Sequence, residues 1–233
     1  MAKDLSLVLP CYNEEAVFEE SVGRILRLLK ATRYDFEILL VDDQSRDRTR
    51  ELMRKAAAKD RRITCLYHDR NRGRGRTVAD GIRKATGRIV GYLDIDLEIR
   101  EEAILSHALA IDEGYDIAYA DRITGLKPGN LLRHLLHALY ILQVRVFLGF
   151  AHGDTNAGCK FFNRKRILPV LERVRDDHWF WDTEILLRGY AAGMRIKKIP
   201  VVYLRNDRKK STVRMGADAA YFLRKIMAYR RER

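Results

Sequence analysis

The stretch Gly91–Glu102, GYLDIDLEIREE, decides the fold, because an apolar strand ends in it and a run of acids begins. Asp94, Asp96 and Glu98 stand at alternate positions at the end of the apolar run RIVGYLD, residues 88–94. Alternate residues of a strand point to the same side, so the three carboxylates are predicted to share one face. Their mutual repulsion requires a positive partner, which predicts a cation site at the end of this strand.

Four more apolar runs alternate with helical periods along the chain. Helices are expected from about residue 14, after Ser45 or Asp47 as an N-cap, and from about residues 77 and 101. Strands this apolar have no solvent-exposed face. Their alternation with helices therefore predicts a parallel sheet covered by helices on both sides. The other strands are predicted at LSLVLP (5–10), FEILLVDD (36–43), ITCLYH (63–68) and DIAYAD (116–121).

Polar clusters follow all five predicted strands. Ligands of such sheets bind at the carboxyl ends of the strands, so the five loops are predicted to face a single ligand. The clusters are CYNEE (11–15), DDQSRD (42–47), HDRNRGRGR (68–76), DIDLE (94–98) and DRITG (121–125).

The composition predicts one globular domain with a basic surface. The 233 residues carry a net charge of +13, which attracts anions such as nucleic acid, acidic lipid headgroups or phosphorylated small molecules. Three scattered cysteines support neither a disulfide framework nor a zinc site, so a reducing cytoplasm is the simplest compartment. No signal peptide is recognised. The most apolar window, residues 131–150, is interrupted by charged and polar residues and is expected to lie on a membrane without crossing it.

The acids at residues 94–98 have two interpretations. Carboxylates at strand ends are often solvated, or they cap helices. The hard oxygens of Asp94, Asp96 and Glu98 also suit Mg²⁺ or Mn²⁺, which take one or two protein carboxylates and complete their shell with water and substrate phosphate. A divalent cation would offset the repulsion among the acids, so we favour a metal site.

Two further loops carry alternatives. Asn13 and Ser45 are expected to cap helices, but capping does not require two successive aspartates. Either Asp42 or Asp43 is therefore predicted to accept hydrogen bonds from a nucleobase or a ribose. In NRGRGRT, residues 71–77, the glycines let backbone amides approach an anion, and a charged turn is the alternative. The spacing is neither that of a Walker A loop nor that of a dinucleotide fingerprint.

Five short motifs occur in order: L-P-x-Y-N-E (9–14), V-D-D-x-S-x-D-x-T (41–49), N-x-G-x-G (71–75), D-x-D (94–96) and D-T-x-x-G-x-K-x-F (154–162). Together they resemble the family 2 glycosyltransferases with a GT-A fold, and most of all the dolichyl-phosphate mannose and glucose synthase group. The resemblance implies an α/β fold whose mostly parallel central sheet is flanked by helices. It also implies a single domain, with a Rossmann-like nucleotide-sugar-binding half (about 1–121), an acceptor-binding half (about 122–215) and an amphipathic basic helix (216–233).

On the donor side, the resemblance implies a metal-dependent nucleotide-sugar site. Asp94 and Asp96, with Glu98 beside them, would hold Mg²⁺ or Mn²⁺ and the donor diphosphate. The segment DTNAGCKFF, residues 154–162, is closer to the branch that uses UDP-glucose, and GDP-mannose is the other donor considered. The nucleotide pocket would be lined by Pro10, Tyr12, Glu14, Asp42, which would contact the base, Gly73 and Asp94.

On the acceptor side, the resemblance implies a polyprenyl phosphate at the cytoplasmic face of a membrane. Family members invert the anomeric configuration, and Asp96, Arg122 and Asp154 are the predicted catalytic residues. A phosphate acceptor is already ionised, whereas a soluble or glycan hydroxyl would need a carboxylate base, first Asp154 and then Asp182. Phosphate contacts are predicted for Arg122, Arg133, Arg208 and Ser211, and sugar contacts for Trp181, Asp182 and Glu184.

The remaining alternatives concern two helices and two other functions. The helix from Leu131 is a core helix, a dimer helix or a membrane-surface helix, and the basic segment 218–233 is a solvated or a membrane-bound helix. A sugar nucleotidyltransferase would carry a basic, glycine-rich loop where this chain has PCYNEE. A nucleic-acid-binding module fits the charge but not the acidic rim. We therefore expect an enzyme that is peripherally associated with a membrane and binds no nucleic acid.

Overall fold

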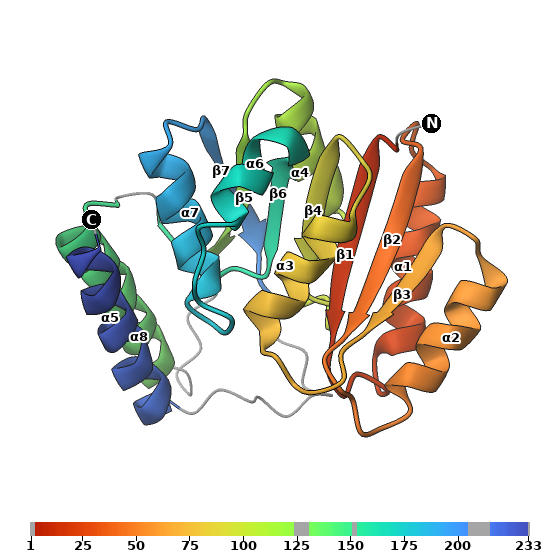
Figure 1. Ribbon diagram of the computed structural model, residues 1–233, viewed down its shortest axis with the longest axis horizontal. Helices are drawn as coiled ribbons and strands as arrows, with labels where there is room; N and C mark the ends of the chain where they lie inside the picture. Colours follow the sequence, from red (N-terminus) through yellow and green to blue (C-terminus); the bar gives the residue numbers. More distant parts are fainter. Residues whose placement is uncertain (1–2, 124–130, 151–152, 205–214, 233) are drawn as a thin grey trace.

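The computed structural model describes residues 3–123, 131–150, 153–204 and 215–232, without the side chains of 131–137 and 215–220. Strands and helices alternate through the first half of the chain, as predicted (Figure 1). The strands are β1 (Leu5–Cys11), β2 (Phe36–Asp42), β3 (Ile63–Tyr67), β4 (Ile89–Leu93), β5 (Ile117–Ile123), β6 (Cys159–Asn163) and β7 (Ile196–Val202). The helices are α1 (Phe18–Lys30), α2 (Thr49–Lys59), α3 (Arg74–Lys84), α4 (Ala103–Asp112), α5 (Leu131–Leu148), α6 (Arg164–Leu171), α7 (Trp181–Ala191) and α8 (Met215–Arg231).

The strands form one seven-stranded sheet in the order β3-β2-β1-β4-β6-β5-β7. Neighbouring strands pair in parallel except at β6, which is antiparallel to both β4 and β5. This mostly parallel sheet with flanking helices confirms the predicted α/β class. Because β6 is reversed, its first residues lie at the same edge as the last residues of β4 and β5.

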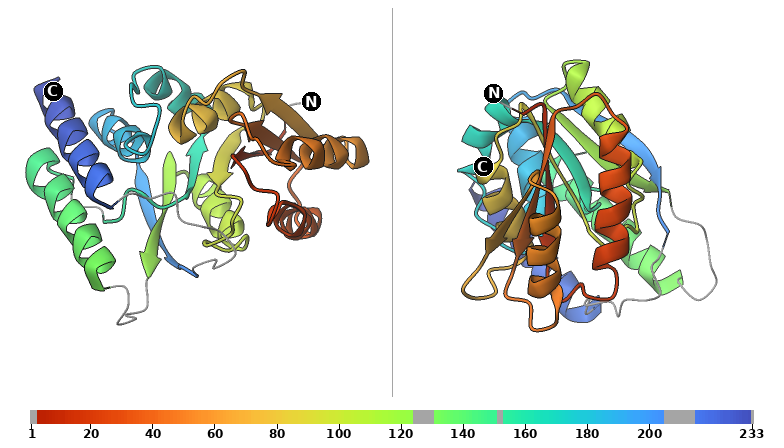
Figure 2. Two further views of the ribbon diagram at one scale, coloured as in Figure 1. Left: turned by 90° about the horizontal axis from the view of Figure 1, so that it is seen from below. Right: turned by 90° about the vertical axis from the view of Figure 1, so that its right-hand side faces the viewer.

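Helices cover both faces of the sheet (Figure 2). Alternate residues of β1 belong to different apolar cores: Leu7 packs in the core that includes α1, α2 and α4, whereas Val8 packs in the core that includes α3, α6 and α7. All seven residues of β1 are buried. A central strand buried on both faces has no polar side, which is why its sequence is apolar apart from Ser6, whose hydroxyl donates to Glu37 at 2.6 Å.

The reversed strand β6 carries a buried lysine into the second core. Lys160 lies opposite Tyr92 of β4 on one side and Tyr119 of β5 on the other. All three side chains are fully buried. A buried ammonium group needs a carboxylate and further hydrogen bonds, so this register implies an anionic partner from another element.

Helices α1 and α2 do not begin at the predicted caps. Helix α1 begins at Phe18, and Asn13 does not cap it, because Asn13 has a φ of 55° and its side chain accepts a hydrogen bond from the Arg46 amide at 2.8 Å. The N-cap residue of α2 is Arg48 and not Ser45 or Asp47, although Asp47 Oδ1 accepts the amide of Thr49, the first residue of α2, at 3.0 Å. The loops before α1 and α2 are thus joined to each other across the rim, while α3 and α4 begin close to the predicted positions.

Helices α5 and α8 pack against each other beside the rest of the domain (Figure 1). Among the helices of the described residues, none combines the length and the apolar character that a membrane crossing requires. The expectation that the window from Leu131 does not cross a membrane agrees with this finding.

Candidate active site

The candidate site lies at the rim formed by the carboxyl ends of the parallel strands. Asp94 directly follows β4, Arg122 is near the end of β5, and Asp154 precedes the reversed strand β6. These residues come from segments far apart in the chain, and the sheet order places their three strands next to one another. The rim therefore gathers acids and arginines from both halves of the sequence, as the polar clusters predicted.

The acidic run forms a turn instead of continuing the strand. Strand β4 ends at Leu93, and Leu97 adopts a φ of 51°. The strand geometry on which the predicted shared face of the three carboxylates rested therefore does not extend to Asp96 and Glu98, although the three acids do alternate with buried residues. The acids Asp94, Asp96 and Glu98 are half-buried, and the apolar residues between and after them, Ile95, Leu97 and Ile99, are buried. The acids of the turn are thus partly accessible at the rim, while the buried apolar residues hold the turn against the core.

Arg74, the first residue of α3, supplies the positive charge beside Asp94. Its Nε and Nη2 atoms donate to Asp94 Oδ1 at 3.0 and 2.7 Å, and its Nη1 atom donates to Asp182. The guanidinium carbon lies 5.4 Å from the ring centre of Tyr92 and 5.7 Å from that of Trp179. One cation beside the acidic run is thus an arginine at the start of α3, which contacts Asp94.

Asp182 lies at the centre of a buried ionic network. Its Oδ1 atom accepts hydrogen bonds from Lys160 Nζ at 2.8 Å and from the Tyr92 hydroxyl, and Oδ2 accepts Arg74. Burial by itself raises the pKa of Asp182, but the charges of Arg74 and Lys160 outweigh it and hold that pKa below its ordinary value. The carboxylate therefore stays ionised as a fixed structural anion between two cations.

A second ion pair, Arg122 with Asp154, stands at the rim between the end of β5 and the segment that precedes β6. Arg122 Nη2 donates to Asp154 Oδ1 at 3.2 Å, and Nε donates to Oδ2 at 2.5 Å. Asp154 is 1% exposed, and its Oδ1 also accepts the Asn156 amide at 3.1 Å. Arg122 lies 5.3 Å from the ring centre of Tyr203, whose hydroxyl donates to Glu98. Glu98 thereby connects the acidic turn, through Tyr203, to the Arg122–Asp154 pair.

Gly158 allows β6 to approach the acidic turn closely. The Asp94 amide donates to the Gly158 carbonyl at 2.9 Å. A Cβ atom at position 158 would stand 1.9 Å from Asp94 Oδ2, far inside contact distance. Only glycine therefore leaves the Asp94 carboxylate in its present position.

The carboxylates at this turn fit a divalent cation that takes few ligands from the protein. Within the described part of the chain, no group of three or more histidine, cysteine, aspartate or glutamate side chains is positioned to hold a metal ion. Asp94 and Asp96 offer two half-buried carboxylates, and Mg²⁺ is usually bound by one or two carboxylates plus water and substrate phosphate. The residues present thus fit Mg²⁺ or Mn²⁺ bound together with a diphosphate.

The predicted nucleotide-binding residues divide into exposed and buried ones. Tyr12 is 39% exposed at the end of β1, whereas Pro10 is a buried residue of that strand. Glu14 is buried, and its amide donates to Thr49 Oγ1 at 2.7 Å. Asp42 is fully buried. Its carboxylate accepts Arg50 Nε at 2.6 Å, the Gln44 amide at 3.0 Å and the Ser45 amide at 3.1 Å.

Asp43 holds the glycine-rich loop in place. Its Oδ1 atom lies 2.8 Å from His68 Nδ1 and accepts the Arg72 amide at 2.7 Å, while Oδ2 accepts the Gly73 amide at 2.9 Å. Gly73 has a φ of 96°, and a Cβ atom there would stand 2.3 Å from His178 Nδ1. The Gly73 amide, predicted to meet an anion, thus meets the carboxylate of Asp43.

The predicted sugar contacts on α7 lie within the protein interior. Trp181 is 1% exposed and packs edge-on against Tyr92 at 5.8 Å between ring centres. Glu184 is 3% exposed and accepts the Asp176 amide at 2.9 Å and Arg188 Nε at 2.7 Å. Sugar binding by α7 remains a prediction. The side chain of Arg133 and all of Arg208 and Ser211 lie outside the described residues.

Four residues of the rim were missed by the sequence analysis: Arg74, Lys160, Trp179 and Tyr203. Arg74 had a usable signal, because it is the basic residue between the two glycines of N-x-G-x-G. Lys160 had one too, as the lysine of D-T-x-x-G-x-K-x-F, where a lysine inside a buried strand requires an anion. Trp179 and Tyr203 carry no local signal, since only folding brings them to Arg74 and Arg122.

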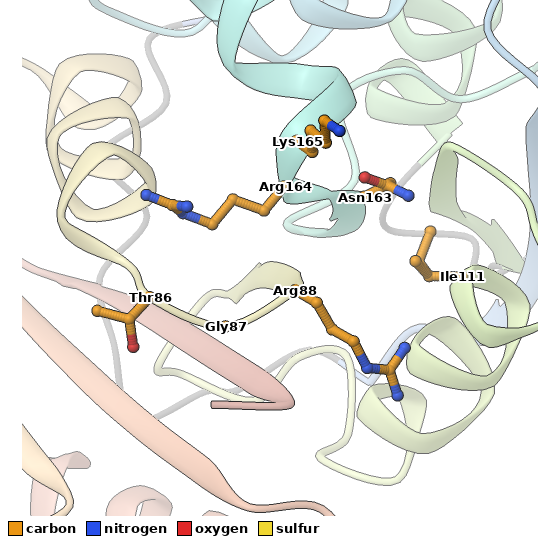
Figure 3. A pocket seen from close by; sticks show the side chains of 7 residues that line it. All are labelled: Thr86, Gly87, Arg88, Ile111, Asn163, Arg164 and Lys165. Atoms are coloured by element: carbon orange, nitrogen blue, oxygen red, sulfur yellow. The ribbon is translucent and has the colours of Figure 1, made fainter. Parts of the chain in front are cut away.

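A cavity of about 340 Å³ lies at the opposite edge of the sheet (Figure 3). It opens beside the residues that precede β4 and those that follow β6, so it shares no residue with the acidic rim. One of its cations, Arg88, is already paired with Asp112 at 2.5 Å. Its lining residues are Thr86, Gly87, Arg88, Ile111, Asn163, Arg164 and Lys165.

Comparison with known proteins identifies relatives of this chain. The sequence profile of glycosyl transferase family 2 matches residues 6–195. Glycosyltransferase AglD of Haloferax volcanii is 32% identical over 204 residues, which are 85% of this chain and 32% of AglD. Dolichyl-phosphate beta-glucosyltransferase ALG5A of Trichomonas vaginalis is 28% identical over 97% of this chain and 74% of its own length. This chain thus spans about a third of AglD.

A solved structure shares the fold. Glucosyl-3-phosphoglycerate synthase of Mycobacterium tuberculosis, crystallised with Mn²⁺, UDP and glucosyl-3-phosphoglycerate, superimposes with a TM-score of 0.73 at 16% identity. The match covers 98% of this chain and 80% of that protein. The two proteins therefore share the arrangement of sheet and helices described above.

Proposed function

Because this chain belongs to glycosyl transferase family 2, we propose that it transfers a hexose from a nucleotide-diphosphate sugar to a polyprenyl phosphate at a membrane surface. The observation that carries the acceptor class is the similarity to a dolichyl-phosphate glucosyltransferase over 97% of the chain. UDP-glucose is the favoured donor and GDP-mannose the second. Inversion at the anomeric carbon would convert an α-linked donor into a β-linked product.

On the donor side, the half-buried acids at the end of β4 support binding of a diphosphate. Asp94 and Asp96 would hold Mg²⁺ or Mn²⁺, which when bound offsets the negative charge that develops on the leaving diphosphate. Tyr12 offers an exposed ring at the end of β1, where a base or ribose could pack. Arg122, at the neighbouring strand end, would add a fixed positive charge to the same region.

On the acceptor side, the Arg122–Asp154 pair supports an anionic acceptor. Arg122 is 21% exposed in its side chain, so it reaches solvent while Asp154 behind it is buried. A phosphate acceptor needs a cation to orient it but no base to deprotonate it. Asp154 would then orient Arg122, because both of its oxygens accept hydrogen bonds from that side chain.

A hydroxyl acceptor is the second candidate, for which Asp154, beside Arg122, would have to act as the base. The variant Asp154→Asn separates the two. We expect it to lower transfer to a hydroxyl by about 10²-fold or more, since proton removal is lost, and to lower transfer to a phosphate less, through the orientation of Arg122. Rates with each acceptor are compared with those of the exposed-site control Asp69→Asn. A loss of only a few fold on a hydroxyl acceptor would remove Asp154 as a base.

Exposed apolar residues on α5 and α8 support membrane association. Leu139, Leu142 and Val146 are 47%, 53% and 66% exposed and recur at helical spacing on α5. Leu223 and Met227 add two exposed apolar side chains on α8. Co-sedimentation with anionic vesicles should therefore retain the protein and should weaken in Leu142→Ser with Val146→Ser. Equal retention of the double variant would exclude this surface.

The direct test is a transfer assay with labelled donors. The chain is incubated with UDP-glucose or GDP-mannose and with farnesyl phosphate as a short polyprenyl phosphate, in the presence of Mg²⁺ or Mn²⁺. We expect label to enter the organic phase with one donor and to disappear when EDTA is added. Transfer of label only to polar hydroxyl compounds, with none to farnesyl phosphate, would overturn the polyprenyl proposal and leave the second candidate.

A further inference from the structure

Arg74 occupies the carboxylate that a divalent cation would need. Two of its nitrogens, Nε and Nη2, donate to the same oxygen, Asp94 Oδ1. The arginine side chain is 14% exposed and the Asp94 side chain 35% exposed, so the pair stands at the boundary between the interior and the rim. A metal-binding carboxylate in this enzyme thus already carries a cation of its own.

The charges of the surrounding network are balanced. Two cations, Arg74 and Lys160, face two anions, Asp94 and Asp182, through direct contacts. Charges removed from water are stable only when they are paired. An additional divalent cation at Asp94 would leave these four side chains with an excess of positive charge, which Asp96 and an anionic ligand together would offset.

We propose that Arg74 is a resident counter-ion of Asp94 that makes the binding of a divalent cation depend on a nucleotide diphosphate. The inference rests on the proposed function. Without a diphosphate, Arg74 competes with the divalent cation for Asp94 and repels it. With a diphosphate, the ligand's negative oxygens attract both Arg74 and the divalent cation, so the same charge that opposed binding now favours the ternary complex.

The contacts of Arg74 allow it to release Asp94 without leaving the site. Its Nη1 atom is held by Asp182, which stays paired with Lys160, and its guanidinium lies near the rings of Tyr92 and Trp179. Trp179 is 38% exposed, so this side of the guanidinium borders solvent. A ligand at the rim could therefore draw Arg74 from Asp94 while its other contacts remain.

The test measures Mn²⁺ binding by the electron paramagnetic resonance of free Mn²⁺, which requires no turnover. The titration is done without nucleotide and with saturating UDP, and repeated with GDP. We expect the wild type to bind Mn²⁺ weakly alone and more tightly with UDP, since coupling between two ligands commonly amounts to about 5- to 150-fold. In Arg74→Met, Mn²⁺ alone should bind more tightly and the coupling to UDP should fall by about tenfold.

Arg76→Met is the matched control, because it removes the same charge from the same loop. Arg76 Nε donates to Asp80 Oδ2 at 3.0 Å, away from Asp94, so this variant should keep the coupling of the wild type. Arg74→Lys retains the charge and should retain most of the coupling. Unchanged Mn²⁺ affinity and coupling in Arg74→Met, or equal effects in Arg74→Met and Arg76→Met, would overturn the inference.

A measurement on the unsubstituted chain covers the case in which Arg74→Met does not fold. The Nε–H resonance of Arg74, identified by its loss in Arg74→Lys, should shift when Mg²⁺ and UDP are added together, because its bond to Asp94 Oδ1 is replaced. No shift at saturation would overturn the inference while leaving the proposed function intact. Absence of any Mn²⁺ binding with UDP or GDP in the wild type would instead overturn the proposed function, and the inference with it.

Discussion

Two acidic pairs at the same rim, Asp42–Asp43 after β2 and Asp94–Asp96 after β4, differ in what holds them. Asp42 and Asp43 are 0% and 3% exposed, and most of the groups that donate to them are backbone amides of neighbouring loops. Asp94 and Asp96 are half-buried. Asp94 accepts two hydrogen bonds from the side chain of Arg74, and Asp96 accepts one backbone amide, that of Glu98, at 3.3 Å.

The difference separates acids that hold the backbone of the rim in place from acids that are available to a ligand. A carboxylate bound by several backbone amides fixes the path of the chain, and replacing those partners with a ligand would cost the loop its structure. A half-buried carboxylate paired with a side chain can exchange that partner for a ligand. We therefore assign Asp42 and Asp43 to the architecture of the rim and propose Asp94 and Asp96 for the ligand.

The largest expected effect is on catalysis in Asp96→Asn. We expect kcat/KM for hexosyl transfer to fall by about 10³-fold, because the amide binds a divalent cation poorly and the charge on the leaving diphosphate is no longer offset. Stability to urea should change by less than about 0.5 kcal/mol, since Asp96 is half-buried in a turn. Kinetics and urea unfolding are measured on the same preparation. A kcat/KM within tenfold of the wild-type value would contradict the proposal that Asp96 binds the ligand.

The next effect is on folding in Asp43→Asn. The variant replaces a charged acceptor of two backbone amides and His68, so we expect a loss of about 2 to 3 kcal/mol in the free energy of unfolding. Asp69→Asn is the control, because that side chain is 82% exposed and its nearest cation is 3.9 Å away. If urea midpoints show equal losses in the two variants, Asp43 does not fix the loop as proposed.

The smallest expected effect is a pH dependence of the free energy of unfolding, which arises from a histidine in the core and not from the rim. The pKa of His107 on α4 is lowered from 6.5 to about 4, chiefly by burial; a hydrogen bond to the Ala103 carbonyl opposes the shift, and the charge of Lys160 adds to it. Between these values the unfolded chain binds the proton and the folded chain does not, so stability is full above pH 6.5 and is lost as the pH falls toward 4. Between pH 6 and 5 the loss from this group is about 1 kcal/mol.

The measurement compares unfolding free energies at pH 6 and pH 5 in the wild type and in His107→Leu. The variant should lose the part of the pH slope that His107 contributes, whatever its absolute stability. A slope identical in both proteins would show that other groups, including those at the rim, account for the acid sensitivity.

Much of the architecture was predictable from the chain because it depends on local patterns. The apolar runs predicted five of the strands and their parallel arrangement, and the clusters that follow them predicted the rim. The role of each acid was not predictable, because partners come from distant positions: Arg74 and Asp182 are separated by 108 residues in sequence. The α1 start was misplaced because Asn13, which looks like a helix cap, is bound to the loop before α2.

The reversed strand β6 has a further consequence for how this enzyme can vary. Side chains on a strand alternate between faces, so a one-residue slip of β6 against β4 would turn Lys160 out of its core and bring an apolar neighbour beside Asp182. A one-residue insertion before β6 keeps this register only if the extra residue lies in a loop outside the paired strands or forms a β-bulge. The register of β6 against β4 and β5 can therefore change only in steps of two residues. Divergence among related chains should concentrate in the loops on either side of β6.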